Sequence, residues 1–307
     1  MKFWNLWWVR IVVDLAIILA GLVLVTVYRA LSPRHFPNSI TPESFNLSYQ
    51  AATFPATDGL LLSGWLLYSP KAMTTIICCH GYPANKSDIL PAVSFLYPDF
   101  NLLLFDFRGH GDSPGRLVTF GLRESKDILG AVNYLKKQPG LKNLPIGIWG
   151  YSLGGAVALK SCTLTEEISA IVTDSTYADF PEMVIQYYGN FGPFKYLLGI
   201  LPEFLGNLFL KGGLACLSPE NIVSLVKIPL LIIHSGNDSF VPVTHAQRLY
   251  QRANQPKELL ILPGEGHGVG LTDEHQKKIT AFFKKYLLGK ILSEKPQTSP
   301  QSREGRR

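Results

Sequence analysis

The sequence contains few charged residues, and this shortage excludes some functions. Charged residues make up 17% of the 307 residues, and the net charge is +6. Half of that excess comes from residues 290–307, which hold five basic and two acidic side chains. The rest of the chain lacks the clustered basic face that nucleic-acid binding requires. We therefore expect no nucleic-acid partner.

The spacings typical of metal sites are also missing. The four cysteines, Cys78, Cys79, Cys162 and Cys216, lack the spacing of zinc ligands, and no His-Glu-x-x-His motif is present. Cys78 and Cys79 are neighbours in an apolar run, which predicts buried thiols. We expect neither a metal nor a cofactor.

A long hydrophobic run lies near the N-terminus. Residues 9–27 are mostly apolar, with Asp14 interrupting the run near its start. A helix of this length spans roughly 28 Å, which is close to the hydrocarbon thickness of a bilayer. Trp4, Trp7 and Trp8 at one end and Tyr28 at the other flank the run as interfacial aromatic residues do. We predict a transmembrane anchor over residues 1–30.

A cleaved signal peptide is the alternative for this segment. The apolar run is longer than the usual signal-peptide core, and no clear Ala-x-Ala site follows it. The anchor prediction implies a single-pass membrane protein. Lys2 and Arg10 balance Arg29 and Arg34, so the sequence does not predict which side of the membrane holds the domain. Residues 31–44 contain prolines and are predicted to be a linker.

From residue 45 to residue 290, apolar runs alternate with helical patterns. Such alternation is typical of an α/β fold with a mostly parallel sheet and helices on both faces. The predicted strands are residues 45–54, 60–68, 74–80, 100–105, 145–150, 168–173, 229–234 and 258–262. The predicted helices are residues 87–96, 122–137, 152–162, 243–252 and 272–287.

The alternation stops between residues 177 and 217. This stretch is rich in aromatic residues and is interrupted by three prolines and by charged residues, so it does not read as a second membrane span. We predict a small helical cap over a site, with a packed insertion of no substrate role as the alternative. Residues 291–307 are rich in Pro, Ser, Gln and Arg and are predicted to be disordered.

A candidate nucleophile lies in Gly150-Tyr151-Ser152-Leu153-Gly154, between a buried strand and a helix. A sharp strand-to-helix turn exposes a serine hydroxyl so that it can reach a carbonyl carbon. A second Gly-x-Ser-x-Gly pattern surrounds Ser113, but no strand directly precedes it, and Pro114 disfavours helical geometry at Ser113. The context favours Ser152 as the nucleophile and Ser113 as a loop residue.

A serine nucleophile needs a base and an orienting carboxylate. His267 lies in a glycine-rich loop after the last predicted strand and is the expected base. Asp238 and Asp174 both follow strands, at the edge where open α/β sheets build their sites. The turn residues around Asp238 favour it, with Asp174 as the alternative. The other histidines are predicted to be structural residues or surface residues, and His245 is among the surface residues.

Two backbone N–H groups are expected to stabilise an oxyanion. Leu153 follows the nucleophile at the start of a helix, where amide groups are free. Tyr82 lies in the loop after the strand that ends at His80, and its amide is the second candidate.

Together these segments resemble the α/β-hydrolase superfamily, and the match runs over roughly residues 45–288. The segments are His80-Gly81-Tyr82, residues 106–113 (Asp-Phe-Arg-Gly-His-Gly-Asp-Ser), residues 150–155, residues 237–242 and Gly266-His267-Gly268. The chain is most similar to lysophospholipase-like and serine-aminopeptidase-like hydrolases, including membrane-anchored members. The resemblance implies esterase, thioesterase, lipase or peptidase chemistry.

Three hypotheses for function follow. The first is a membrane-anchored serine hydrolase that cleaves an ester or thioester with an apolar, lipid-like acyl part through Ser152, Asp238 and His267. The second is an aminopeptidase-like serine peptidase, for which Glu182 and Glu203 in the cap could hold a substrate amine. The third is a non-catalytic membrane-bound interaction protein, which would predict a broken triad position.

Overall fold

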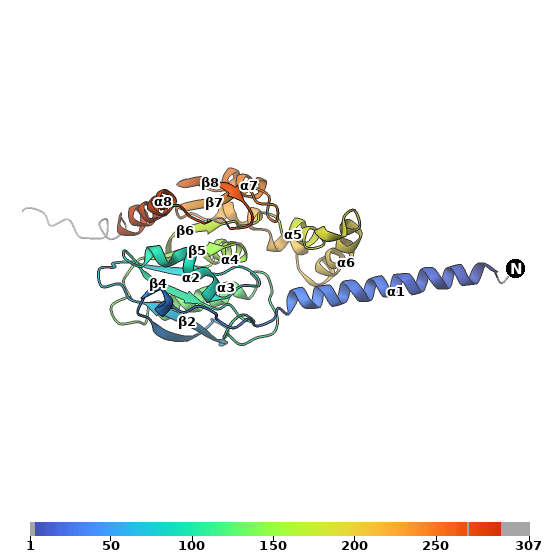
Figure 1. Cartoon of the computed structure of the whole chain (residues 1–307), viewed down its shortest axis with the longest axis horizontal. Helices are drawn as coiled ribbons and strands as arrows, with labels where there is room; N and C mark the ends of the chain where they lie inside the picture. Colours follow the sequence, from blue (N-terminus) through green and yellow to red (C-terminus); the bar gives the residue numbers. More distant parts are fainter. Residues whose placement is uncertain (1–3, 269, 290–307) are drawn as a thin grey trace, which may run out of the picture.

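A long helix projects from an α/β body in this protein (Figure 1). The computed structural model describes residues 4–268 and 270–289. The predicted disordered tail, residues 291–307, lies outside the described residues. Helix α1 runs over Trp4–Leu31, so it extends beyond the predicted apolar run at both ends.

The body is built on one eight-stranded sheet. Its order is β1-β2-β4-β3-β5-β6-β7-β8, with β2 antiparallel to both neighbours and the other neighbouring pairs parallel. This mostly parallel arrangement confirms the predicted fold class. The strands are β1 (Gln50–Pro55), β2 (Leu61–Leu67), β3 (Thr75–Cys79), β4 (Asn101–Phe105), β5 (Ile146–Tyr151), β6 (Ile168–Asp174), β7 (Leu230–Asn237) and β8 (Lys257–Glu265).

Helices cover both faces of the sheet, which explains why the central strands are continuous apolar runs. In β3, Ile77 and Cys79 face one core, whereas Ile76 and Cys78 face the other. The first core contains side chains of α3 (Glu124–Leu135), α4 (Leu153–Cys162) and α7 (Thr244–Arg252). The second contains side chains of α2 (Lys86–Val93) and α8 (Asp273–Phe283), and a π-helical turn, Lys284–Leu288, extends α8. Cys78 and Cys79 are both buried, as predicted.

The segment between β6 and β7 forms two further helices, α5 (Phe180–Tyr187) and α6 (Phe194–Phe209). Short 3-10 turns accompany them at Gly189–Phe191, Leu214–Leu217, Pro219–Asn221 and Val223–Leu225. We call residues 177–217 the cap. It lies beside the inner end of α1, and a small cluster formed by Val23, Tyr188 and Leu198 joins them (Figure 1).

Two expectations from the sequence were wrong. The first strand begins at Gln50 rather than at Phe45, because residues 42–45 form a 3-10 turn that ends at Asn46 in a left-handed conformation (φ 55°). His245, expected at the surface, is only 3% exposed, and its Nδ1 accepts a hydrogen bond from the Ala178 N–H.

Candidate active site

Ser152 occupies a strained turn between β5 and α4. Its backbone has φ 50° and ψ −115°, a combination that residues with a side chain rarely adopt. The turn is possible because Gly154 lets α4 approach β3, since a Cβ there would lie 2.4 Å from the Cys79 carbonyl oxygen. The Ser152 N–H donates to the Asp174 carbonyl at 2.8 Å, which fixes the turn against β6.

The structure brings Ser152, His267 and Asp238 together. His267 Nε2 lies 2.9 Å from Ser152 Oγ, and His267 Nδ1 lies 2.7 Å from Asp238 Oδ2. An ionised carboxylate can only accept, so Nδ1 carries the proton, and Nε2 is left to accept from the serine hydroxyl. These residues come from the loops after β5, β7 and β8, whose carboxyl ends meet at one edge of the sheet.

Asp238 is held in its ionised form by several donors. Its Oδ1 accepts from the N–H groups of Val241 at 2.8 Å and Phe240 at 2.9 Å. Burial disfavours the carboxylate, but the hydrogen bonds from His267 and from these amides outweigh it and lower the pKa of Asp238. The environment therefore favours a negative charge beneath the imidazole.

Asp174, the alternative acid, occupies a different position. It is buried and accepts a hydrogen bond from the Ser175 hydroxyl at 3.0 Å. Burial raises its pKa to about 6, partly offset by that hydrogen bond. It lines a second cavity of about 490 Å³ together with Trp149, Tyr151 and Gly268. Within the described residues, Asp238 and not Asp174 forms a hydrogen bond with the histidine.

Tyr82 and Leu153 are the two residues whose amides are expected to form the oxyanion site. Both residues line the cavity that contains Ser152. Within the described residues, neither N–H donates a hydrogen bond to the protein. Gly81 passes so close that a Cβ there would lie 3.2 Å from Ser152 Cβ. Two backbone donors without a protein acceptor thus belong to residues that line the cavity at Ser152, which is compatible with an oxyanion site.

His80 fixes the loop that carries Tyr82. Its Nε2 accepts from the Phe107 N–H at 3.0 Å, so its Nδ1 carries the proton and donates to the Gly81 carbonyl at 2.7 Å. The Gly81 carbonyl and the Tyr82 N–H belong to the same peptide unit and point in opposite directions. The hydrogen bond to His80 therefore directs the Tyr82 N–H away from His80. Burial, together with the neighbouring His110, lowers the pKa of His80 well below its usual value.

We expect His80 to stay neutral in the folded protein at pH values well below the usual histidine pKa of about 6.5. Because the unfolded chain takes up this proton near pH 6.5 and the folded chain does not, the stability contributed by this group decreases as the pH falls below about 6.5. An NMR titration of the imidazole nitrogens checks this. A His80 midpoint near pH 6.5 would contradict it.

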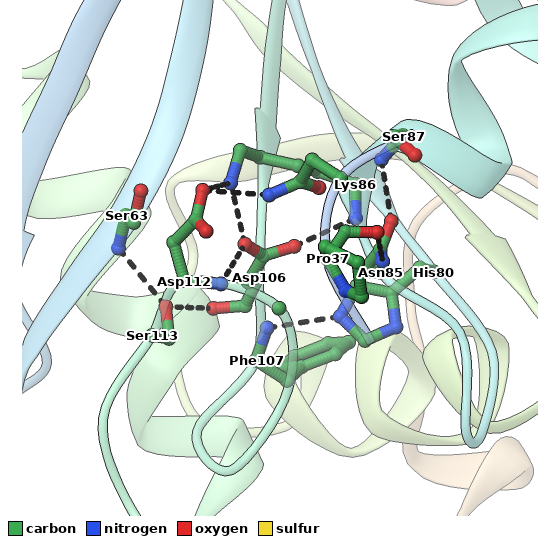
Figure 2. A network of polar contacts seen from close by, with 12 residues as sticks. Pro37, Ser63, His80, Asn85, Lys86, Ser87, Asp106, Phe107, Asp112 and Ser113 are labelled. Carbon is green, nitrogen blue, oxygen red and sulfur yellow. Dashed lines mark hydrogen bonds and ion pairs between the residues drawn. The ribbon is translucent and has the colours of Figure 1, made fainter. Parts of the chain in front are cut away.

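A buried polar network also holds the loop after β3, which carries Tyr82 (Figure 2). The Lys86 ammonium is fully buried and pairs with Asp106, and it also pairs with Asp112 at 2.7 Å. Asp106 accepts from the N–H groups of Lys86 and Asp112 at 2.7 and 2.8 Å. Asn85 caps α2 and donates to the carbonyl of Phe36 at 3.1 Å. The network therefore ties the loop after β3 to the loop after β4 and to the segment after α1.

The second Gly-x-Ser-x-Gly serine belongs to this network. Ser113 is buried, its Oγ donates to the Asp106 carbonyl at 2.6 Å, and it accepts from the Ser63 N–H at 2.9 Å (Figure 2). Both roles hold the loop in place, which agrees with its interpretation as a loop residue.

Replacing Lys86 by methionine is expected to lower the free energy of unfolding by about 3–5 kcal/mol, because Asp106 is then left buried without its cation. Lys126→Met is the matched control, since Lys126 is 46% exposed and lies 3.7 Å from Asp58. The free energy of unfolding of Lys126→Met is expected to fall by less than about 1 kcal/mol. Urea denaturation of both variants measures the difference, and equal losses would contradict the prediction.

A cavity of about 420 Å³ opens at Ser152 and is lined almost entirely by apolar side chains. Its wall combines the inner end of α1, the loop before α3 and the cap. The lining residues include Val27, Ala30 and Leu31 of α1; Val118, Phe120 and Leu122 of the loop; and Met183, Tyr187, Leu205, Phe209 and Leu214 of the cap. The cap therefore forms part of the cavity that reaches Ser152.

The contribution of α1 to this cavity was missed by sequence reasoning. The Leu31 carbonyl accepts from the Val118 N–H at 2.7 Å, which joins the end of α1 to the cavity wall. Nothing in the sequence indicates this contact, because the apolar residues of α1 are also what a membrane anchor requires.

Glu182 and Glu203 do not form an amine site at Ser152. Glu182 pairs with Arg248 at 2.8 Å and lies 3.3 Å from His245. Neither Glu182 nor Glu203 lines the cavity at Ser152.

Comparison with known families gives two matches. Residues 74–197 match the family model for the alpha/beta hydrolase fold, and residues 179–305 match that for PhoPQ-activated pathogenicity-related protein. Among curated proteins, the uncharacterized protein YfhR of Escherichia coli strain K12 is 32% identical, covering 74% of this chain and 76% of YfhR. The uncharacterized protein YqkD of Bacillus subtilis is 30% identical, covering 75% of this chain and 77% of YqkD.

Among solved structures, the Pyrococcus furiosus esterase Pf2001 is similar over almost its whole length. The match has a TM-score of 0.70 and 26% identity, and it covers 85% of this chain and 99% of the esterase. The shared region is thus much larger than the motifs around Ser152.

Proposed function

This chain belongs to the α/β-hydrolase fold family, and on that basis we propose that it is a membrane-anchored serine hydrolase that cleaves esters or thioesters with an apolar acyl part. One observation carries the proposal: the hydrogen-bonded series Asp238–His267–Ser152 ends in an apolar cavity. Likeness to an esterase of known structure supports the same chemistry.

In the proposed mechanism, Ser152 Oγ attacks the acyl carbonyl carbon while His267 Nε2 takes the hydroxyl proton. Asp238 orients the imidazole and stabilises its positive charge. The N–H groups of Tyr82 and Leu153 bind the oxyanion, each contributing a few kcal/mol of transition-state stabilisation. His267 then gives its proton to the departing alcohol or thiol, and the acyl-enzyme is hydrolysed by water activated through the same histidine.

The membrane anchor is part of the same proposal. Residues 7–31 lie in a helix that is long enough to cross a bilayer, and an 18-residue stretch of it has a mean hydropathy of 2.6 and is only 6% buried against the protein. The position of this helix also argues against a cleaved signal peptide. Val27, Ala30 and Leu31 line the cavity at Ser152, so cleavage after this helix would remove part of the cavity wall.

The peptidase hypothesis receives less support. A peptidase of the aminopeptidase-like branch needs free carboxylates near the nucleophile to hold the substrate amine. Glu182 is already paired with Arg248, and Glu203 lies outside the cavity. An apolar acyl chain fits the lining better than a charged amine does.

A fluorophosphonate probe tests the proposed function directly, because it phosphonylates activated serines. Peptide mapping of the labelled wild-type protein should place the adduct on Ser152. The proposal is wrong if the wild-type protein is not labelled, or if labelling persists undiminished in Ser152→Ala.

The length of the acyl chain should be limited by the cavity at Met183. Burying one methylene group contributes about 0.8 kcal/mol. If the cavity can no longer hold two methylenes of the acyl chain, kcat/KM for that substrate is expected to fall about tenfold. Met183→Trp is therefore expected to reduce the preference for a dodecanoyl over a butanoyl ester by about tenfold or more. Hydrolysis of a series of acyl esters measures this preference.

Met73→Trp is the matched control, since Met73 is 52% exposed on the body of the protein. Its chain-length profile should equal that of the wild type. An unchanged profile in Met183→Trp would show that the acyl chain does not occupy this cavity.

A further inference from the structure

Helix α6 exposes an apolar stripe that the proposed function does not yet use. Leu197, Ile200, Phe204 and Leu208 are spaced by three or four residues, so they share one face of the helix. Their exposed fractions lie between 50% and 63%. Glu203, the acidic residue of α6, lies beside this stripe rather than within it. Contiguous exposed apolar faces of this kind mark interaction surfaces.

The opposite face of α6 is already occupied. Leu198, Pro202 and Gly206 are buried, the first against α1 and the last against Leu214. The exposed stripe is therefore a second face that points away from the protein.

The cap packs against a part of α1 that would lie within the bilayer, and this indicates that lipid covers the exposed stripe. The cap contacts α1 through Leu19, Val23 and Val27, and Thr26 Oγ1 lies 2.8 Å from the Tyr188 hydroxyl. A bilayer core requires about 20 helical residues. The apolar helix runs from Trp7 to Leu31, and every stretch of about 20 residues within it includes Leu19, Val23 and Thr26.

If α1 crosses a bilayer, the cap must then enter it as well. When the hydrocarbon boundary is set at Tyr28, Leu19 lies about 14 Å deeper, at a rise of about 1.5 Å per residue. The cap residues packed on this part of α1 share its depth. The exposed stripe belongs to the same helix as Leu198, which packs on α1. At that depth its side chains would face hydrocarbon, and this would account for their apolar character.

We propose that the cap is immersed in one leaflet of the bilayer beside α1, so that the cavity at Ser152 opens into the lipid phase and takes its substrate from there. The substrate class is a membrane-resident amphiphile whose acyl chain passes between α1 and the cap. Val27 and Leu31 on one side, and Leu205 and Phe209 on the other, line that route to Ser152. The source of the substrate rests on the proposed function, whereas immersion of the cap does not.

Photolabelling of the full-length protein tests immersion. The protein is reconstituted in phosphatidylcholine vesicles that contain a phosphatidylcholine with a diazirine at the middle of one acyl chain, and adducts are mapped by mass spectrometry. We expect adducts on α6, at residues 197–208, as well as on α1. Adducts confined to α1 would overturn the proposal.

A pair of variants tests the route of the substrate. Phe204 lies in the stripe but does not line the cavity, and Leu225, which is 59% exposed, lies outside the cap. Phe204→Glu should reduce hydrolysis of a long-chain ester embedded in vesicles at least tenfold and leave hydrolysis of a water-soluble butanoyl ester unchanged. Leu225→Glu should change neither rate.

The outcomes separate this proposal from the proposed function. Equal loss of both activities in Phe204→Glu, or no loss of either, would overturn uptake from the lipid phase. Failure of the wild-type protein to hydrolyse even the soluble ester would refute the hydrolase proposal, while the photolabelling would still decide whether the cap is immersed.

Discussion

Replacing Ser152 by alanine is expected to lower kcat for ester hydrolysis by about 10⁶-fold, the size of effect found when the nucleophile of a serine hydrolase is removed. The variant loses the atom that forms the acyl-enzyme, and the remaining His267 and Asp238 have no nucleophile to activate. The amides of Tyr82 and Leu153 still bind an oxyanion, so a small rate above that of water remains. Single-turnover kinetics with a chromogenic ester would measure the loss.

Ser113→Ala is the matched control, because Ser113 occupies the same sequence pattern. Its hydroxyl makes two hydrogen bonds in the loop after β4 and does not contact His267. We expect a loss of stability of about 1–3 kcal/mol with kcat retained in the folded fraction. A large fall in kcat in Ser113→Ala, with activity kept in Ser152→Ala, would reverse the assignment of the nucleophile.

Changing Asp238 to asparagine is expected to lower kcat by about 10⁴-fold while the fold is kept. The amide nitrogen of asparagine can donate to His267 Nδ1, which would place the imidazole proton on Nε2. In that tautomer Nε2 cannot accept the proton of Ser152. The imidazolium formed during the reaction would also lose its counter-charge.

The comparison with Asp174→Asn makes this test specific. Asp174 is a buried carboxyl at the end of the neighbouring strand, and its side chain accepts a hydrogen bond from Ser175 and makes none with the histidine among the described residues. We expect kcat to change less than about tenfold in Asp174→Asn, since no hydrogen bond to the reacting groups is lost. A larger effect of Asp174→Asn than of Asp238→Asn on kcat would identify Asp174 as the orienting acid.

Much of the sheet could be predicted from the sequence, for a physical reason. Strands buried on both faces must be apolar at every position, so β3 and β4 appear as short uninterrupted runs. The edge strand β1 has exposed positions and a weaker pattern, and its start was placed five residues too early. The turn over residues 42–45 has no pattern that distinguishes it from a strand end.

The candidate site could be predicted in part because a parallel sheet collects its loops at one edge. Ser152, Asp238 and His267 each follow a predicted strand, so proximity follows from topology. Choosing between Asp238 and Asp174 requires the direction of side chains, which a single sequence does not give. The burial of His245 was missed because it depends on Ala178 and Glu182, more than sixty residues away in the sequence.

The contact between Leu31 and Val118, together with the cavity lining by Val27 and Ala30, has a practical consequence for handling the protein. Removing the first helix to improve solubility would also remove one side of the cavity at Ser152. Such a shortened protein would keep Ser152, Asp238 and His267 but accept a different range of acyl groups. Substrate specificity measured on the shortened protein is therefore expected to differ from that of the full chain, because the helix forms part of the cavity wall in addition to its proposed role as an anchor.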